Sequence, residues 1–205
     1  MGRALIAFII LIALGISNSN AQDKTALTKV FSESYSYESK AEYTKAIEVI
    51  KKVYSTDSYE MNLRLGWLNY EAKNYKESLV YYNRAIQLLP LSIEAKLGYA
   101  YPAYALGQKE AVIVKYKEIL ETDPNNYYGN YRIGSLYFEM KDYSNARKHF
   151  DKLINFYPFD YDIIIMSAWT YYYLNKPREA KVLFNKALLN RPSDKSATEG
   201  LSLIK

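Results

Sequence analysis

The stretch from Tyr127 to Asp160, YYGNYRIGSLYFEMKDYSNARKHFDKLINFYPFD, decides the fold of this chain. Its apolar residues follow the spacing of two short amphipathic helices, which the polar pair Lys141 and Asp142 separates. Pro158 cannot continue the second helix and ends it. Helices of about a dozen residues cannot bury their apolar faces alone, so this unit needs partners elsewhere in the chain. The buried face of its second helix is expected to consist of Ala146, Phe150, Leu153 and Ile154.

The partners are further copies of the same unit. Prolines recur at a constant interval of 34 residues, at Pro90, Pro124, Pro158 and Pro192. In phase with them, a large aromatic residue occupies position 24 of each unit: Tyr82, Tyr116, Phe150 and Phe184. Position 8 is always small: Gly66, Ala100, Gly134 and Ala168. Because glycine has no Cβ, we expect Gly134 to lie where two helices cross closely.

The period of 34 residues, with its small, aromatic and proline markers, resembles the tetratricopeptide repeat. The resemblance covers four units, at residues 59–92, 93–126, 127–160 and 161–194, and a degenerate unit at 27–58 that lacks the glycine and the closing proline. Residues 195–205 read as a capping helix whose Leu201 and Ile204 cover the last repeat. The resemblance implies an all-α, right-handed superhelical solenoid of about five helix-turn-helix units with this C-terminal cap.

The third repeat, residues 93–126, departs from a regular helix at Pro102. A proline at this point removes the hydrogen bond to the carbonyl of Gly98 and is expected to bend the first helix of the repeat. Two interpretations stay open. The bend is either a tolerated local distortion or a device that widens a groove at the centre of the array.

The first 21 residues form a separate segment. Arg3 precedes an apolar run of thirteen residues, Ala4–Ile16, and Ser19-Asn20-Ala21 has the small-x-small pattern of a cleavage site. This pattern predicts a secretory signal peptide, cut before Gln22 and followed by a short linker at residues 22–26. The apolar run is shorter than the roughly twenty residues that span a bilayer, and an uncleaved membrane anchor at residues 4–16 is the alternative. We therefore expect an exported protein, periplasmic or extracellular.

The composition argues against catalysis and against nucleic-acid binding. The chain has no cysteine and a single histidine, His149, so the usual metal sites and nucleophile–base pairs cannot be assembled. The net charge of +5 is not gathered into a long basic block, which nucleic-acid binding would require. We predict a protein that is not an enzyme, has no metal site and no cofactor, and binds no nucleic acid.

The first helices of the repeats are unusually aromatic, and tyrosine alone accounts for 23 residues of the chain. The resemblance implies that positions 2, 5, 9, 12 and 13 of these helices line the concave face of the array, with two arginines of position 6 at its rim. The candidate partner-binding residues of this groove are Arg64, Trp67, Tyr70, Tyr101, Tyr104, Tyr128, Tyr131, Arg132, Phe138, Trp169, Tyr172 and Tyr173.

An aromatic groove is suited to recognition, because tyrosine and tryptophan bring a large contact area at a small entropic cost. We expect a scaffold that binds a peptide or a segment of a partner protein. Three alternatives remain: a glycan- or cell-wall-binding module, a structural subunit of an envelope complex, and rings that only pack against one another. The lysine and asparagine clamp by which some family members hold chaperone C-termini is missing, since position 9 holds Trp67, Tyr101, Ser135 and Trp169.

Overall fold

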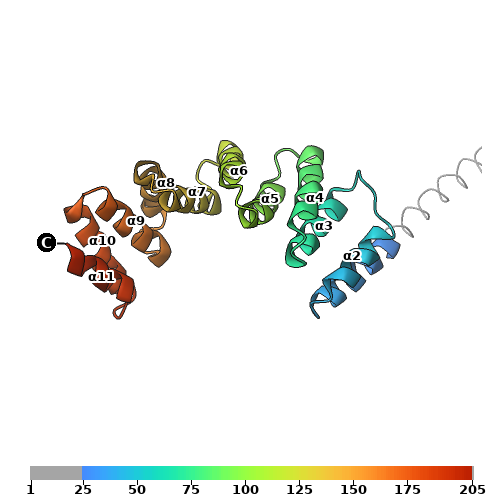
Figure 1. Cartoon of the computed structure of the whole chain (residues 1–205), viewed down its shortest axis with the longest axis horizontal. Helices are drawn as coiled ribbons and strands as arrows, with labels where there is room; N and C mark the ends of the chain where they lie inside the picture. Colours follow the sequence, from blue (N-terminus) through green and yellow to red (C-terminus); the bar gives the residue numbers. More distant parts are fainter. Residues whose placement is uncertain (1–24, 205) are drawn as a thin grey trace, which may run out of the picture. The chain divides into compact units, whose positions relative to one another are not determined.

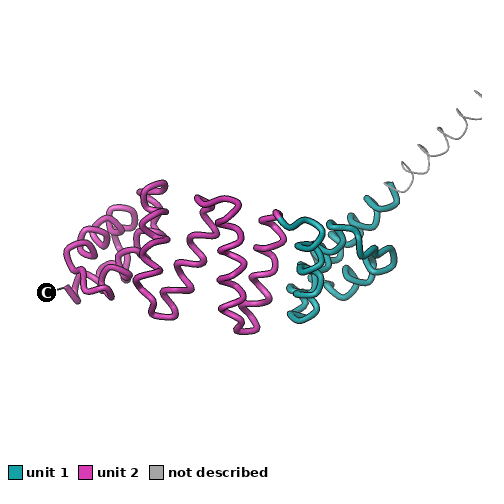
Figure 2. Tube along the Cα trace, turned by 90° about the horizontal axis from the view of Figure 1, so that it is seen from above, with its two compact units in different colours: residues 1–90 teal, residues 91–205 magenta. Residues whose placement is uncertain are grey.

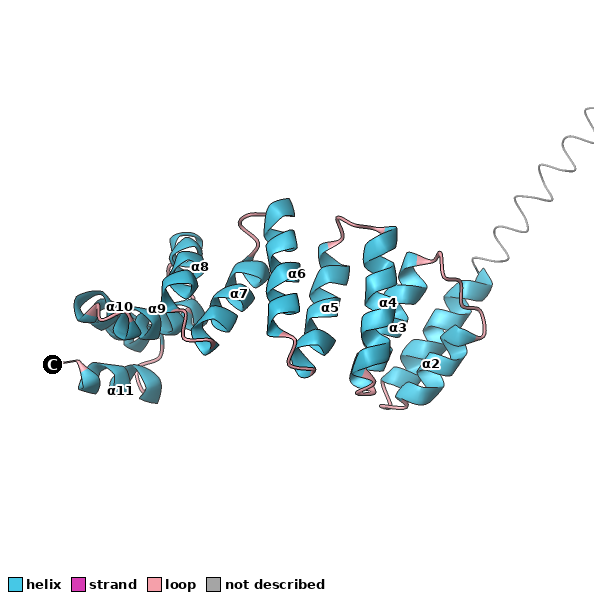
Figure 3. Cartoon of the chain, turned by 45° about the horizontal axis from the view of Figure 1, so that its top comes forward, coloured by secondary structure: helices cyan, strands magenta, loops and turns pink. Residues whose placement is uncertain are grey.

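The computed structural model describes residues 25–204, in which the regular elements are all helices (Figures 1 and 3). It confirms the all-α fold of helix pairs that the repeats predict. The chain divides into two compact units, one ending at Pro90 and the other beginning at Leu91 (Figure 2). No helix among the described residues has the length and apolar character needed to cross a membrane. The predicted signal peptide at residues 1–21, its cleavage site and residues 22–24 of the linker lie outside the described residues.

The first unit contains two helix pairs. Helical residues 25–38 precede α2 (Tyr43–Lys51), and α3 (Tyr59–Glu71) precedes α4 (Tyr75–Leu88). Residues 25 and 26, expected in a linker, are already helical. The core of this unit joins both pairs and consists of Ala46, Ile47, Ile50, Met61, Leu65, Leu68 and Tyr81.

The second unit contains three helix pairs and a final helix. The pairs are α5 (Ile93–Ala105) with α6 (Lys109–Thr122), α7 (Tyr127–Glu139) with α8 (Tyr143–Phe156), and α9 (Tyr161–Tyr173) with α10 (Pro177–Asn190). The final helix, α11 (Lys195–Leu203), packs on α9 and α10. Leu201 and Ile204, the residues expected to cover the last repeat, are partly buried against the core of α9 and α10.

Helix α5 accommodates Pro102 inside its span. The helix continues past the proline to Ala105, and the carbonyl of Pro102 accepts a hydrogen bond from the amide of Leu106 at 3.1 Å. The ring of Pro102 is buried beside Ala103. The proline therefore packs within the repeat and does not end its first helix.

The turn inside every helix pair contains one residue with positive φ, between 55° and 75°: Ala41, Lys73, Gly107, Lys141 and Asn175. Only one of the five is glycine, although the left-handed region is costly for other residues. The last four are 34 residues apart, which places them at position 15 of their repeats. Ala41 fixes the register of the degenerate repeat, because it makes Leu27 equivalent to Tyr59.

The turn between successive repeats is closed by a capping residue at position 34. Its side chain accepts a hydrogen bond from the third amide of the next helix. Two of these capping residues also accept a hydrogen bond from a tyrosine. Asp160 accepts one from the Tyr127 hydroxyl at 3.1 Å, and Asp194 accepts one from the Tyr161 hydroxyl at 2.5 Å. Each aspartate thus starts one helix and holds the preceding repeat. The capping residues are Ser58, Ser92, Asn126, Asp160 and Asp194.

The two helices of a pair meet where the small residue of position 8 faces the aromatic ring of position 24. A Cβ on Gly134 would lie 3.0 Å from Cε1 of Phe150, and a Cβ on Gly66 would lie 2.9 Å from Cδ1 of Tyr82. Phe150 is fully buried and Tyr82 nearly so. The expectation that Gly134 lies at a close helix crossing is confirmed.

We predict that Gly134→Leu lowers the free energy of unfolding by about 1–3 kcal/mol, because the larger side chain must displace the Phe150 ring or separate α7 from α8. Urea unfolding followed by far-UV circular dichroism measures the change. Gly134→Ala is the control and should be milder, since Ala100 and Ala168 occupy the same position in other repeats. Equal stability of the leucine variant and the wild type would contradict the proposed crossing.

Candidate partner-binding surfaces

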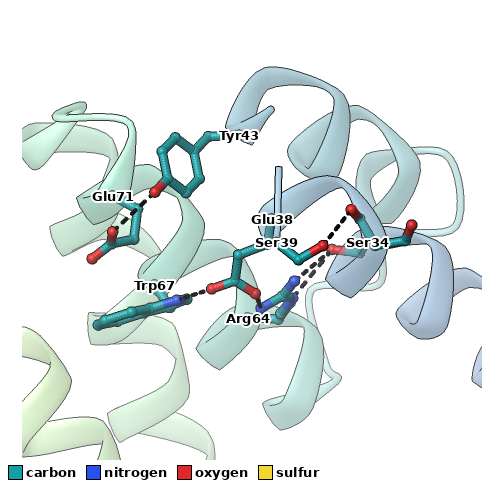
Figure 4. Close-up of polar contacts among 8 residues, drawn as sticks. Ser34, Glu38, Ser39, Tyr43, Arg64, Trp67 and Glu71 are labelled. Carbon is teal, nitrogen blue, oxygen red and sulfur yellow. Dashed lines mark hydrogen bonds and ion pairs between the residues drawn. The ribbon is translucent and has the colours of Figure 1, made fainter. Parts of the chain in front are cut away.

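Arg64 does not lie at the rim of a groove, as the sequence led us to expect, but inside the first unit. Only 6% of it is exposed. Its Nε and Nη2 atoms donate to Oγ of Ser34 at 3.1 and 3.0 Å, and its Nη1 donates to Glu38 at 2.5 Å (Figure 4). The guanidinium also lies over the ring of Tyr35, with Cζ 3.9 Å from the ring centroid. Every side of this cation is therefore occupied by its own chain.

Trp67 lies beside this ion pair and remains one-third exposed. Its Nε1 donates to the second carboxylate oxygen of Glu38, so one carboxylate joins Arg64 and Trp67 (Figure 4). The Trp67 ring also contacts Tyr70, with ring centroids 5.8 Å apart. The candidate residues of the first unit thus form one connected patch that Glu38 holds in place.

In the second unit, α5 presents two open tyrosines. Tyr101 is 42% and Tyr104 47% exposed. The Tyr104 hydroxyl donates to Glu139 of α7 at 2.9 Å, and Lys109 of α6 donates to the other oxygen of the same carboxylate at 2.8 Å. Arg132 on α7 is exposed. This patch joins three helices and carries both charge signs.

Further along α7, the candidate tyrosines differ in exposure. Tyr128 is the most open, at 62%, whereas Tyr131 is half-buried. Tyr131 stacks on Tyr127 and meets the edge of Phe150, so its ring belongs partly to the core of the repeat. Of this pair, Tyr128 is the residue that a partner would reach.

The remaining candidates gather in one aromatic cluster between α7 and α9. Tyr173 stacks on Tyr143 at a centroid distance of 4.7 Å and packs against Phe138 at 5.7 Å. Trp169 and Tyr172 adjoin Tyr173 at 6.0 and 5.3 Å. Tyr173 is 49% exposed, while Phe138, Trp169 and Tyr172 are half-buried.

Trp169 is anchored more firmly than the other members of this cluster. Its ring meets that of Phe184 edge-on at 5.0 Å, and its Nε1 donates to Oγ of Ser196 at 2.8 Å. Ser196 belongs to α11, so the final helix lies against the tryptophan. Trp169, which the sequence predicted to line the groove, therefore also belongs to the core of the last repeat.

His149 is a structural residue of α8. Its Nδ1 donates to Oδ1 of Asn130 at 3.1 Å, and its ring stacks on that of Tyr137. Burial, assisted by the positive charges of three nearby lysines, lowers the pKa of His149 to about 4. The imidazole is therefore neutral at pH 7. The described residues contain no cluster of histidine, aspartate and glutamate that could hold a metal ion.

Two residues of these surfaces were absent from the candidates chosen from the sequence. Glu38 was missed because it lies in the degenerate repeat, 26 residues before the arginine that it binds. Tyr143 was missed because it begins a second helix, although tyrosine at this position in three repeats, Tyr43, Tyr75 and Tyr143, was a readable signal.

Comparison with known proteins supports the repeat assignment. The family model of the tetratricopeptide repeat matches residues 59–90, and a second model of the same description matches residues 128–159. The chain is a tetratricopeptide repeat protein. It is 32% identical over 94 residues to the TPR repeat-containing thioredoxin TTL4 of Arabidopsis thaliana. That match covers 46% of this chain and only 14% of the relative's length.

Solved structures show the same fold. A tetratricopeptide repeat protein from Parabacteroides merdae superposes with a TM-score of 0.74 at 21% identity, over 84% of this chain and 69% of the other. YrrB, which is described as a TPR protein with an unusual peptide-binding site, superposes with a TM-score of 0.71 at 15% identity, over 85% of this chain and 91% of the other. At such identities the likeness concerns the fold alone.

We predict that Trp169→Ala lowers the free energy of unfolding of this tetratricopeptide repeat protein by roughly 2 kcal/mol, because the ring packs on Phe184 and anchors α11. The loss is smaller than for a fully buried tryptophan, since Trp169 is half-buried. Thermal unfolding followed by circular dichroism measures the loss. Trp169→Phe keeps the ring contact and should recover most of the stability. An unchanged melting temperature in the alanine variant would show that the ring does not belong to the core.

We further predict that His149 makes the tetratricopeptide fold less stable in mild acid. Its folded pKa, about 4, is below the ordinary value of 6.5, so between these values the unfolded chain binds a proton that the folded chain does not. The contribution is complete above pH 6.5 and is lost as the pH falls towards 4. Urea midpoints at pH 7 and pH 5 should differ more for the wild type than for His149→Gln; equal differences would contradict the assignment.

Proposed function

We propose that this chain is an exported scaffold that binds a peptide, or an extended segment of a partner protein, on the open aromatic residues of its first helices. The tetratricopeptide fold itself is a scaffold for protein–protein interaction. Burial of tyrosine and tryptophan side chains is a common source of binding energy at interfaces, because these rings combine large area with a polar group.

One observation supports this proposal above the others. Aromatic residues at position 24 of the second helices are at most 5% exposed: Tyr82, Tyr116, Phe150 and Phe184. On the first helices, by contrast, Tyr101, Tyr104, Tyr128 and Tyr173 are between 42% and 62% exposed. The chain therefore has aromatic residues that hold the repeats together and others that the fold does not need to bury. The second set is available for a partner.

Two further points favour the proposal. The similar protein YrrB is described as having a peptide-binding site, which makes a peptide ligand a reasonable expectation for this fold. The proposal of export depends on residues 1–21 alone, where a basic start, a short apolar run and a small-x-small site follow one another. An uncleaved anchor at residues 4–16 would place the same scaffold at a membrane surface.

The proposal is tested with the full-length chain, expressed in its native host, crosslinked and recovered from envelope and medium fractions. We expect that Tyr101→Ala/Tyr104→Ala/Tyr128→Ala loses a partner that the wild type retains, with affinity for the purified partner reduced about tenfold or more. The mass of the recovered chain tests export, since the cleaved protein begins at Gln22.

The control replaces apolar residues of similar or greater exposure on the second helices, Val114→Ala/Val182→Ala/Leu189→Ala. This variant should retain the partner. Loss of the partner in the control alone would place the interaction on the second helices and contradict the proposal. A response of tryptophan fluorescence to soluble cell-wall glycan, without any protein partner, would favour the glycan-binding alternative.

A further inference from the structure

The turn between α8 and α9 carries three large apolar side chains into solvent. Phe156 is 55% exposed, Tyr157 42% and Phe159 57%. The Tyr157 ring meets that of Tyr127 edge-on at 5.0 Å, whereas the rings of Phe156 and Phe159 contact no other aromatic ring in the part of the chain that the structure describes. We call Phe156, Tyr157 and Phe159 the apolar turn.

The fold does not require apolar residues in this turn, because other repeats build the same turn from polar ones. In repeats 93–126, 127–160 and 161–194 the amide of position 31 donates to the carbonyl of position 27 at 2.8 Å, and that of position 34 donates to the carbonyl of position 31 at 3.0–3.2 Å. The residues equivalent to the apolar turn are Thr122, Asp123 and Asn125, then Asn190, Arg191 and Ser193, while repeat 59–92 has Leu88, Leu89 and Leu91.

A row of lysines leads to the apolar turn. Lys148, Lys152 and Phe156 follow one another at intervals of four residues on α8, so they share one face of the helix. Lys117 of α6 lies beside this row. Burial is the largest cause of the lowered pKa of His149, and the charges of these three lysines add to it, which places their ammonium groups around the same imidazole.

The three lysines have no acidic partner within the chain. The ammonium of Lys148 donates to Oδ1 of Asn145 at 3.0 Å, and that of Lys152 donates to the carbonyl of Pro124 at 3.0 Å. Neither they nor Lys117 form an ion pair with any residue between 25 and 204. Their charges are therefore available to an anion outside the chain.

The nearby carboxylates do not cancel this charge. Asp151 accepts the hydroxyl of Tyr171 at 2.8 Å, and Asp160 accepts that of Tyr127 at 3.1 Å. Glu121, which is exposed and follows Lys117 by four residues on α6, offsets one of the three cations. The face that adjoins the apolar turn is therefore positive.

Exposed aromatic rings beside lysines are suited to a lipid surface. Aromatic side chains favour the boundary between headgroups and acyl chains, and lysine side chains extend their charge to the headgroups. Lysine is depleted at protein–protein interfaces, so the row favours a bilayer over a second protein. We propose that α8 docks on a bilayer that contains anionic phospholipid, with the apolar turn inserted among the headgroups and the three lysines facing lipid phosphates. This goes beyond the proposed function and does not depend on it.

The test measures insertion of the apolar turn itself. The full-length chain carrying Phe159→Trp is added to vesicles of phosphatidylglycerol and phosphatidylcholine, with the phosphatidylcholine brominated on its acyl chains. Bromine quenches a neighbouring indole, so the signal reports contact at position 159 even if residues 1–21 also bind the bilayer. The wild-type emission of Trp67 and Trp169 is subtracted. We expect the remaining emission to fall about twofold or more relative to vesicles without bromine.

The control places the same indole at the opposite end of the same helix pair. Met140 follows α7 and is 45% exposed, so Met140→Trp should be quenched hardly at all. Addition of Phe156→Ser to the Phe159→Trp chain should weaken its affinity for the vesicles about tenfold or more, because one of the two open rings is lost.

The role of charge is tested in the same Phe159→Trp chain. Lys117→Gln/Lys148→Gln should weaken binding about tenfold to vesicles with phosphatidylglycerol, and added salt should have the same effect. Binding to phosphatidylcholine alone should hardly change. Lys76→Gln/Lys181→Gln removes two exposed charges from α4 and α10 and should leave the affinity unchanged, which separates a local contact from the effect of net charge.

Three results would overturn the proposal. The first is quenching of the Phe159→Trp chain that is absent or no stronger than that of the Met140→Trp chain. The second is an affinity that neither Phe156→Ser nor the lysine substitutions alter, and the third is equal affinity for vesicles with and without phosphatidylglycerol. Because the substituted residues are exposed, the circular dichroism spectrum should be unchanged, which confirms that each variant is folded.

Discussion

The contact between a small residue at position 8 and an aromatic ring at position 24 is the constraint on which the rest of the structure depends. It brings the two helices of a repeat close enough for the ring to be buried between them, as Phe150 is beside Gly134. Burial of such a ring removes a large apolar area from water, which no single helix of this length could do. The ring of Phe184 is also approached closely from α11 by Gly200, a small residue that does not lie at position 8.

Because the second helices supply the buried rings of the core, the fold does not require every aromatic residue of the first helices to be buried. Some of them nevertheless pack in the core: the ring of Tyr131 contacts Phe150, and the ring of Trp169 contacts Phe184. Others stay open, as Tyr104 and Tyr128 do. The difference depends on what the neighbouring repeat brings alongside. Tyrosine suits both roles, because its hydroxyl can satisfy a carboxylate within the chain, as in the bond from Tyr127 to Asp160, or remain in water.

The arginines of position 6 show how one repeat position acquires two roles. A buried guanidinium is unfavourable without a countercharge, so the burial of Arg64 depends on Glu38. Where the preceding repeat carries a tyrosine at the position of Glu38, the arginine stays in solvent, as Arg132 does. A difference at one position of the preceding repeat, glutamate or tyrosine, therefore separates an arginine in an internal ion pair from an exposed one. Both arginines lie on equivalent first helices.

The sequence by itself determined the repeat length, the helix pairs and the small–aromatic crossing, because these depend on spacing along the chain and recur in several copies. The sequence did not reveal the left-handed backbone conformation at position 15, because residues such as Ala41 and Lys73 adopt it there in place of the expected glycine. Only the tertiary structure decided which rings are open and which cation is paired. Residues far apart in the chain, such as Glu38 and Arg64 or Trp169 and Ser196, meet only in the folded chain, and these contacts decide burial where residue type alone does not.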